Sequence, residues 1–482
     1  MDRQHKTAGK ANAMETWKCT GMRNMDELES HSTTGSHASK SPGNRIGHVP
    51  ARPEMVRQAW PLPCQPAPPA NTPLPLFDGL FLQDPYPTYR ALREQGPVHW
   101  RDDVFQGAWI LPHYADVAFA LRDPRFSSQR TGGWIKRVPD AATPAADGRG
   151  QAGRDAFQRM FARAMVFLDA PDHRRLRRAM AAGFHPSRIR ALAPRIEQLA
   201  DELFDPLQHC PQFEFIGAVA RPLPSRVMAL LLGVDRSDEA RFMAWSDSLA
   251  TFIGALQPSA DELRGARRGL MQMAGYFDGL LRERRQAPGT DLIGCLLQAE
   301  AAGEIHADGE LVAQCAMLLF AGHETTRNLL GNAVHTLLSH PAQWRALRAC
   351  PEAMPAAIRE ILRYDSPVQY TGRRVAATLT LHGHTLRRGD LVLALIGAAN
   401  RDPARFAAPD TFDIARRESS HLSFGSGPHV CIGATLALLE AEVTLRQMAR
   451  RWPDLRLAES TTSWNGNPGL RGLTKLQLRT VG

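Results

Sequence analysis

Near the end of the chain, Cys431 has the surroundings of a metal ligand. It lies in the segment 424–433, which reads F-G-S-G-P-H-V-C-I-G, and a strong helical pattern follows over 434–451. Backbone N–H groups and the dipole at a helix N-terminus favour negative charge, so the thiol is expected to be held as a metal-binding thiolate. Gly425, Gly427 and Gly433 are expected to adopt turn conformations closed to other residues and to let a large flat ligand approach. The alternative is a buried cysteine in a glycine-rich turn.

A second chemical pair lies in the centre of the strongest helical pattern, 308–339, where the segment 321–326 reads A-G-H-E-T-T. We expect Asp308 to cap this helix and Pro341 to mark its end, over roughly 48 Å. Gly322 costs about 1 kcal/mol in a helix interior relative to alanine, so something other than helix propensity selects it. Small residues let a flat ligand lie against a helix, and a threonine hydroxyl can bond the carbonyl four residues earlier. The alternative is a packed, kinked helix.

Together the two segments resemble the motifs of the cytochrome P450 superfamily. The segment 424–433 has all six fixed positions of the haem-ligand pattern F-G-x-G-x-H-x-C-x-G, and 321–326 fits the oxygen-activation pattern A-G-x-[DE]-T-T about a hundred residues earlier. The resemblance covers about residues 76–480. It implies a mainly α fold with a small β region, in which a helical prism holds haem b between the long central helix and the cysteine loop.

The resemblance also implies a role for individual residues. Cys431 would be the iron ligand, and a thiolate there favours O–O cleavage. Thr325 would hold bound O2 or its water partners, and Glu324 would serve the proton path. The further haem contacts that it implies on the two segments are Ala321, Gly322, Phe424 and Gly433.

Four groups resemble the family's binders of the haem propionates, which need cationic hydrogen-bonding partners. His173 and Arg177 lie one helical turn apart in an H-x-x-x-R pattern, and His429 precedes the cysteine by two residues. The fourth group is Arg373 or Arg374, and the offset to the turn at Gly383 favours Arg373. On its pattern alone, the arginine-rich helix would fit a basic solvated face equally well.

Other basic and acidic residues have implied roles around the site. Glu360 and Arg363 form an E-x-x-R pattern, and by resemblance they would join Arg416 in a buried structural network that holds the cysteine loop. Arg417 is a possible substitute for Arg416. The remaining arginines of the H-x-x-x-R helix would border the docking face of a small acidic electron carrier, which complementary charge would steer. These are Arg174, Arg175 and Arg178.

Composition limits the partners and the compartment. The net charge of +9 favours acidic partners, but no nucleic-acid-binding module is visible, and we expect no nucleic-acid partner. The seven cysteines are scattered without a C-x-x-C pair, which argues against a disulfide framework and a cysteine zinc site. No apolar run approaches the ~18 residues of a membrane helix. We therefore expect a cytoplasmic protein without a membrane anchor, and a monomer.

The pattern changes along the chain suggest one folded body behind an extension. Residues 1–70 are polar and end in a proline-rich run, so we predict a disordered extension or an over-long translation start. Residues 71–482 would form a single cytochrome P450 catalytic domain. Within it we predict a helix over 84–96, strands at 98–100, 108–111 and within 373–396, turns at Gly383 and Gly389, and a loop over 131–153 that could act as a lid.

The implied reaction inserts one oxygen atom of O2 into a hydrophobic small molecule, by hydroxylation or epoxidation, in secondary metabolism. Electrons would come from NAD(P)H through a separate ferredoxin or flavodoxin and its reductase. The alternatives are a peroxygenase that uses peroxide and a non-enzymatic haem-thiolate sensor. Whether His323 faces substrate or core stays open. The expected substrate-lining ranges are 131–165, 228–252, 317–321, 367–370 and 467–473.

Overall fold

The computed structural model describes residues 75–129, 148–255, 258–306, 309–418, 420–459 and 462–480, and it describes 148–155 by their backbone alone. All of these residues lie within one unit, Gln58–Gly482. The expected N-terminal extension, 1–70, lies outside the described residues, as does most of the expected loop over 131–153. The last residues of that loop prediction are wrong, because Gly148–Arg163 forms helix α5.

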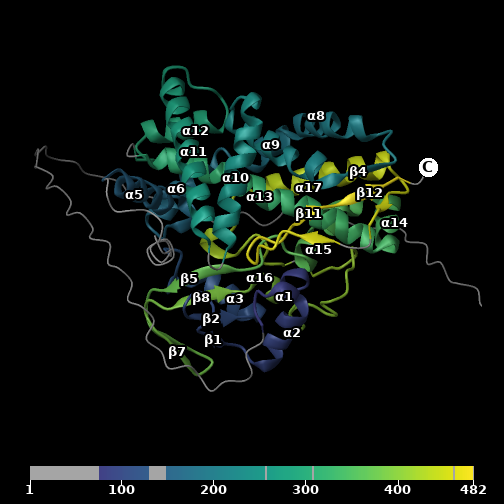
Figure 1. Cartoon of the computed structure of the whole chain (residues 1–482), viewed down its shortest axis with the longest axis horizontal. Helices are drawn as coiled ribbons and strands as arrows, with labels where there is room; N and C mark the ends of the chain where they lie inside the picture. The colour runs from purple at the N-terminus through teal and green to yellow at the C-terminus, as the bar shows by residue number, and fades with distance from the viewer. Residues whose placement is uncertain are drawn as a thin grey trace, which may run out of the picture. The chain divides into compact units, whose positions relative to one another are not determined.

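Helices dominate this unit and lie mainly on one side of its largest sheet (Figure 1). Besides α5, the helices are α1 (Gly79–Gln83), α2 (Tyr86–Gln95), α3 (Tyr114–Arg122), α6 (Asp172–Ala181), α7 (Pro186–Ala191), α8 (Ala193–Phe204), α9 (Pro222–Leu232), α10 (Glu239–Gly254), α11 (Ala260–Gln286), α12 (Leu292–Ala301), α13 (Glu310–Ser339), α14 (Pro341–Ala349), α15 (Met354–Tyr364), α16 (Ile396–Ala399) and α17 (Ala434–Arg451).

The strands form small sheets, as the sequence predicted. They are β1 (His99–Arg101), β2 (Ala108–Leu111), β3 (Phe126–Ser127), β4 (Gln212–Glu214), β5 (Thr371–Val375), β6 (Leu379–Leu381), β7 (His384–Leu386), β8 (Leu391–Ala394), β9 (Arg456–Leu457), β10 (Ser463–Trp464), β11 (Leu473–Lys475) and β12 (Gln477–Arg479). The largest sheet has the order β1-β2-β8-β5-β3, and β2 and β8 are parallel. The predicted turns are confirmed, because Gly383 and Gly389 both have positive φ, at 80° and 98°.

The largest sheet is buried on both faces. Successive residues of a strand point to opposite faces. Trp109 and Leu111 accordingly join a cluster that includes residues of α3, whereas Ala108 and Ile110 join another that includes residues of α1 and α2. Because both faces of β2 are buried, the strand has a continuous apolar sequence, and alternation of apolar and polar residues could not show which side chains point to which face.

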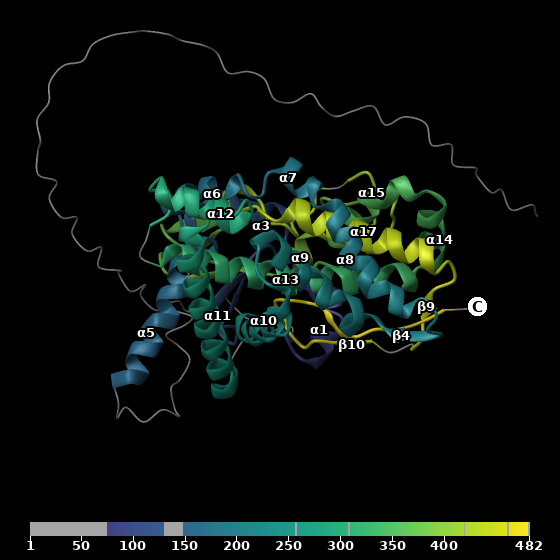
Figure 2. The same cartoon turned by 90° about the horizontal axis from the view of Figure 1, so that it is seen from above.

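Helix α13 forms the centre of the main hydrophobic core. It contacts α5, α9, α10, α11, α15 and α17, and Figure 2 shows it lying among these helices. The helix begins at Glu310, and its N-cap is Gly309, whose φ is 91°. Asp308, the expected N-cap, lies outside the described residues. The end at Ser339 agrees with the prediction from Pro341. Its 30 residues correspond to about 45 Å.

Helix α17 follows the cysteine loop directly, as predicted, and it packs against α8, α13 and α15. The loop thus leads directly into a helix that packs against α13. Within the described residues, no helix combines the length and the apolar character that crossing a membrane requires. The mainly helical fold with a small β region is therefore confirmed.

Candidate active site

A cavity of about 380 Å³ lies between α13 and the cysteine loop, and residues of both line it. Cys431 is exposed to this cavity from the loop. Ala321, Gly322 and Thr325 line it from α13. The structure therefore brings together the two segments that the sequence singled out, although about a hundred residues separate them.

Backbone geometry in the loop holds the thiol at the cavity. The N–H of Cys431 donates to the carbonyl of Phe424 at 2.8 Å, which closes the loop upon itself. Gly425 and Gly427 have φ of 74° and 72°, a left-handed conformation that glycine tolerates best. Gly433 differs from the prediction, because its φ of −88° is open to any residue. A side chain at Gly425 would also bring its Cβ to 3.4 Å from the carbonyl oxygen of His429.

The charge state of Cys431 does not follow from the helix N-terminus alone. Burial among the surrounding atoms raises the pKa of its thiol, while the backbone N–H of Gly433 and the guanidinium of Arg177 act in the opposite direction. Desolvation is the largest of these effects, so the loop and the helix N-terminus do not by themselves lower the pKa of this thiol, contrary to the expectation. A bound metal ion deprotonates a coordinating thiol outright.

On the opposite wall, the side chains of Glu324 and Thr325 on α13 face different cavities. The hydroxyl of Thr325 donates to the carbonyl of Ala321 at 2.6 Å, the bond expected from its position, and the residue lines the cavity. Glu324 is buried and lines a second cavity, of about 580 Å³, on another side of the helix. Gly322 lines the first cavity beside Met228, and a Cβ on this residue would collide with the Met228 side chain.

The carboxyl of Glu324 has one charged and one neutral partner. Its Oε2 lies 3.1 Å from Arg327 Nη1, and its Oε1 accepts a hydrogen bond from Asn328 Nδ2 at 3.1 Å. Burial nevertheless raises the pKa of the Glu324 carboxyl, although Arg327 and Asn328 act in the opposite direction. The neighbouring His323 faces away from the first cavity, because its Nε2 lies 3.0 Å from the carbonyl oxygen of Arg221. This answers the question that the sequence left open.

Cationic and imidazole groups gather at one side of the first cavity. His173 and His429 stack with their ring centroids 3.9 Å apart, and both line the cavity with Arg177. Arg177 Nη1 donates to the carbonyl of Val430 in the cysteine loop. Burial lowers the pKa of His173, as does Arg177, so its ring is neutral near pH 7 and has one N–H to donate.

The two arginines that were candidates for binding a propionate are adjacent residues of β5. Arg373 lines the cavity, and its Nη1 donates to the carbonyl of Gly372 at 2.8 Å. Arg374 Nη1 donates instead to the carbonyl of Gly389 at 2.9 Å. Because adjacent residues of a strand point to opposite faces, only Arg373 is placed where a propionate could reach it.

The three members of the expected structural network meet in space. Arg363 contacts both oxygens of Glu360, at 2.7 and 2.8 Å, and Arg416 Nε lies 3.1 Å from Glu360 Oε2. Both arginines also donate to the carbonyl of Thr411. The network therefore links α15 to the segment that leads into the cysteine loop. Arg416, and not its possible substitute Arg417, is the second arginine of this network.

Apolar side chains form most of the remaining wall of the first cavity. Of the expected ranges, 228–252 contributes Met228, and 367–370 contributes Pro367 and Val368. The range 467–473 does not line this cavity, because Asn467 and Pro468 line the second one. Several lining residues were not predicted from the sequence. Among them, Leu329 lies four residues after Thr325 on α13, a helical spacing that could have indicated it. The missed residues include Met180, Phe184, Ile253, Leu329, Leu362 and Ile396.

The residues present fit a haem. A thiol is exposed on one wall, small residues lie on the other, and two glycines of the loop have a left-handed backbone. Cationic and imidazole donors at one side suit two propionate carboxylates. Cys431 would be the iron ligand, and His173, Arg177, Arg373 and His429 would hold the propionates. Such a fold and cavity define the class of haem-thiolate proteins.

Comparison with known proteins gives the family. The family model described as Cytochrome P450 matches residues 140–349 and 352–460. Cytochrome P450 107B1 of Saccharopolyspora erythraea is 39% identical over 409 residues, which are 84% of this chain and 96% of the relative. The cytochrome P450 monooxygenase PikC of Streptomyces venezuelae is 36% identical over 406 residues, which are 83% of this chain and 92% of the relative.

A solved structure agrees with these relatives. The crystal structure of P450BioI in complex with hexadec-9Z-enoic acid ligated acyl carrier protein has a TM-score of 0.76 and 34% identity, and it covers 84% of this chain and 100% of that chain. The chain therefore belongs to the cytochrome P450 family. It is an oxidoreductase of the monooxygenase class, and membership of the family implies haem as its cofactor and O2 as a substrate.

Proposed function

We propose that residues 71–482 form a single catalytic domain that hydroxylates or epoxidises a hydrophobic small molecule. One atom of O2 enters the substrate and the other leaves as water, with two electrons and two protons consumed. The haem, when bound through Cys431, supplies the activation of O2. The observation that supports this proposal best is the single cavity with Cys431 on one wall and Thr325 on the other.

Two adjacent residues of α13 would carry protons between two cavities. Glu324 lines the second, polar cavity, and Thr325 lines the first, apolar one. We propose that Glu324 takes protons from water in the second cavity and that the Thr325 hydroxyl passes them into the first cavity, where O2 would bind. The raised pKa of Glu324 suits a group that must hold a proton before it donates it.

We expect Glu324→Gln to lower turnover by about 100-fold, the lower end of the contribution of a positioned acid or base. In the parent protein, turnover should fall as pH rises through the raised pKa of Glu324, because the carboxyl then loses its proton. The variant should lack this fall. The measurement is the pH profile of kcat, with Glu262→Gln as a control that changes an acid lining the same cavity. An unchanged profile in Glu324→Gln would contradict the role.

The cavity lining supports a hydrophobic substrate. Its walls carry leucine, isoleucine, methionine and phenylalanine side chains, with polar groups confined mainly to the propionate side and to α13. The related P450BioI was solved with a fatty acid ligated to an acyl carrier protein. A long-chain acyl, terpenoid or polyketide-like compound of secondary metabolism fits this lining.

Electrons would come from NAD(P)H through a ferredoxin or flavodoxin and its reductase. Arg174 and Arg178 of α6 are exposed and remain proposed docking residues for such an acidic carrier. Arg175 is no longer proposed as a docking residue, because it pairs with both oxygens of Glu310 at 2.7 and 2.8 Å. We further propose a monomer in the cytoplasm; the lack of disulfides between the described cysteines supports the compartment.

Isotope labelling tests the proposed reaction. The holoenzyme is supplied with a candidate substrate, a ferredoxin, its reductase, NADPH and ¹⁸O2, and the product is analysed by mass spectrometry. One ¹⁸O atom should appear in the product. Product formation that requires added peroxide and incorporates oxygen from it would favour the peroxygenase instead. Haem binding without turnover of any compound in a broad library would favour the sensor.

A further inference from the structure

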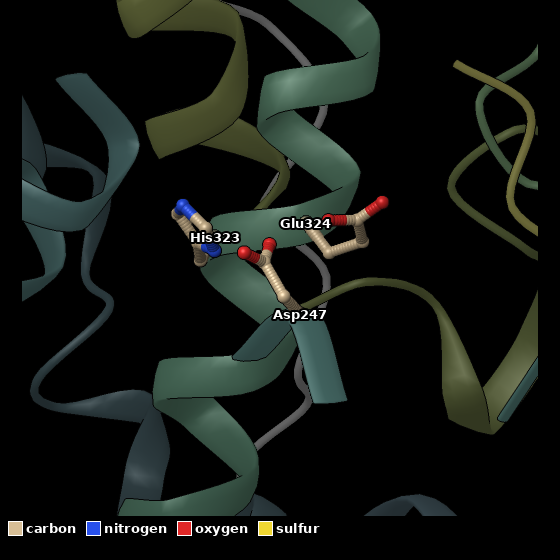
Figure 3. A group of neighbouring side chains, drawn as sticks. All are labelled: Asp247, His323 and Glu324. Atoms are coloured by element: carbon tan, nitrogen blue, oxygen red, sulfur yellow. The ribbon is translucent and has the colours of Figure 1, made fainter. Parts of the chain in front are cut away.

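A group of metal-ligating side chains lies beside α13, away from the haem cavity. His323 and Glu324 come from α13 and Asp247 comes from α10, and Figure 3 shows Asp247 between the other two. One ligand atom from each residue can be chosen so that all three lie within 4.8 Å of one another. The oxygen-binding role of α13 does not account for His323 or for Asp247.

The strongest sign of a missing partner is on His323. Its side chain is 1% exposed, and its Nδ1 makes no hydrogen bond among the described residues. Its other nitrogen, Nε2, lies 3.0 Å from the carbonyl oxygen of Arg221 and is placed to donate its proton there. That bond fixes the tautomer in which Nδ1 carries a bare lone pair, as in many metal-binding histidines. Leaving such an atom buried and unpaired costs about 1–3 kcal/mol.

The two carboxylates supply negative charge and are already shared with arginines. Asp247 pairs through one oxygen with Arg221 and through the other with Arg327, the latter at 3.3 Å. Glu324 also contacts Arg327, at 3.1 Å. To bind a metal ion, Asp247 would keep one arginine contact and release the other. Glu324 would keep Arg327 on Oε2 and use Oε1, which now accepts the hydrogen bond from Asn328. The side chain of Arg221 is 38% exposed and can also move toward solvent.

A hydrated ion can reach the cluster. The second cavity, of about 580 Å³, is lined by Asp247, Glu324, Arg221 and Arg327. A tetrahedral zinc site with bonds of about 2.0–2.1 Å places its ligand atoms roughly 3.3 Å apart, so modest side-chain rotation would close the site. The fourth position would remain for a water molecule from the cavity.

We propose that Asp247, His323 and Glu324 form a binding site for a divalent transition-metal ion that joins α10 to α13. One imidazole and two carboxylates are a donor set that suits Zn²⁺ and neighbouring first-row metals better than Mg²⁺ or Ca²⁺. The scattered cysteines argued only against a zinc site made of cysteines, and the proposed site contains no cysteine. The ion would bind the Glu324 carboxylate that the proposed proton path needs, so it would also slow turnover. Only this effect on turnover rests on the proposed function.

Binding is tested without reference to activity. Holoenzyme is freed of loosely bound metal and titrated with Zn²⁺ by isothermal calorimetry, alongside His323→Gln, Asp247→Asn and the control His335→Gln. His335 lies on the same helix, twelve residues on, and packs against Trp464. We expect the first two variants to bind at least about 10-fold more weakly at one site, since losing even a residue that only orients a ligand costs that much. The control should bind as the parent does.

Equal affinity and stoichiometry in all four proteins would overturn the site. Thermal unfolding without metal checks that each variant is folded, and Asp247→Asn keeps the test decisive should His323→Gln unfold. A second arm measures the ratio of turnover with and without Zn²⁺. A fall in the parent but not in His323→Gln supports the consequence for Glu324. Zinc binding without any such fall would leave the metal site standing and would contradict the proton path instead.

Discussion

Replacing Cys431 with alanine is expected to abolish monooxygenase turnover while the polypeptide still folds. The thiol is exposed to the cavity, so its removal leaves no buried polar atom without a partner. The loop is closed by backbone bonds, including Cys431 N–H to Phe424 carbonyl at 2.8 Å, that the substitution keeps. What is lost is the thiolate ligand that favours O–O cleavage. Haem content, circular dichroism and turnover are measured together.

A matched control is Cys210→Ala. Cys210 is also a partly exposed free thiol, but it does not line the cavity, and it contacts the carbonyl of Pro206. Its variant should keep the haem content and the turnover of the parent. Measurable turnover in Cys431→Ala, or an equal loss in both variants, would contradict the assignment of the iron ligand.

The second large effect concerns stability. Arg363→Ala is expected to lower the free energy of unfolding by about 3–5 kcal/mol, because removing one partner of a buried ion pair leaves the other charge poorly compensated. Arg363 is 1% exposed, and it contacts Glu360 and the carbonyls of Asn400, Pro409 and Thr411. Because these carbonyls belong to the segment before the cysteine loop, haem content should fall as well. Chemical denaturation of the haem-free protein separates the two effects.

Neighbouring substitutions sharpen this test. Arg359→Ala changes an arginine on the same helix that is only partly buried, and its effect should stay within about 0.5 kcal/mol. Arg363→Lys keeps the charge but loses the planar fork that spans both oxygens of Glu360, so an intermediate loss is expected. A loss for Arg363→Ala no larger than that for Arg359→Ala would show that the network does not hold the loop.

Short-range patterns in the sequence were enough to predict the elements that carry the chemistry. The apolar period over 308–339 predicted α13, and glycines around Cys431 predicted a loop before α17. These signals succeed because helix periodicity and turn formation depend on neighbouring residues. The pairing of the two segments around one cavity came from the family resemblance and not from periodicity.

Features that depend on packing between distant elements were not predictable in this way. Arg175 could not be told from its neighbours Arg174 and Arg178 until the structure placed Glu310 beside it. The thiol of Cys431 is desolvated by atoms from other elements, which outweighs the local helix effect. His323 faces the carbonyl of Arg221, a hundred residues away, and no local pattern indicates that direction.

The measurement that tests the central claim most directly is the carbon monoxide difference spectrum of the dithionite-reduced protein, recorded for the parent and for Cys431→Ala. A strongly red-shifted Soret band in the parent that is lost in the variant is the result expected for haem bound through the Cys431 thiolate. A spectrum typical of histidine-ligated haem in the parent, or a red-shifted band that survives in Cys431→Ala, would contradict it.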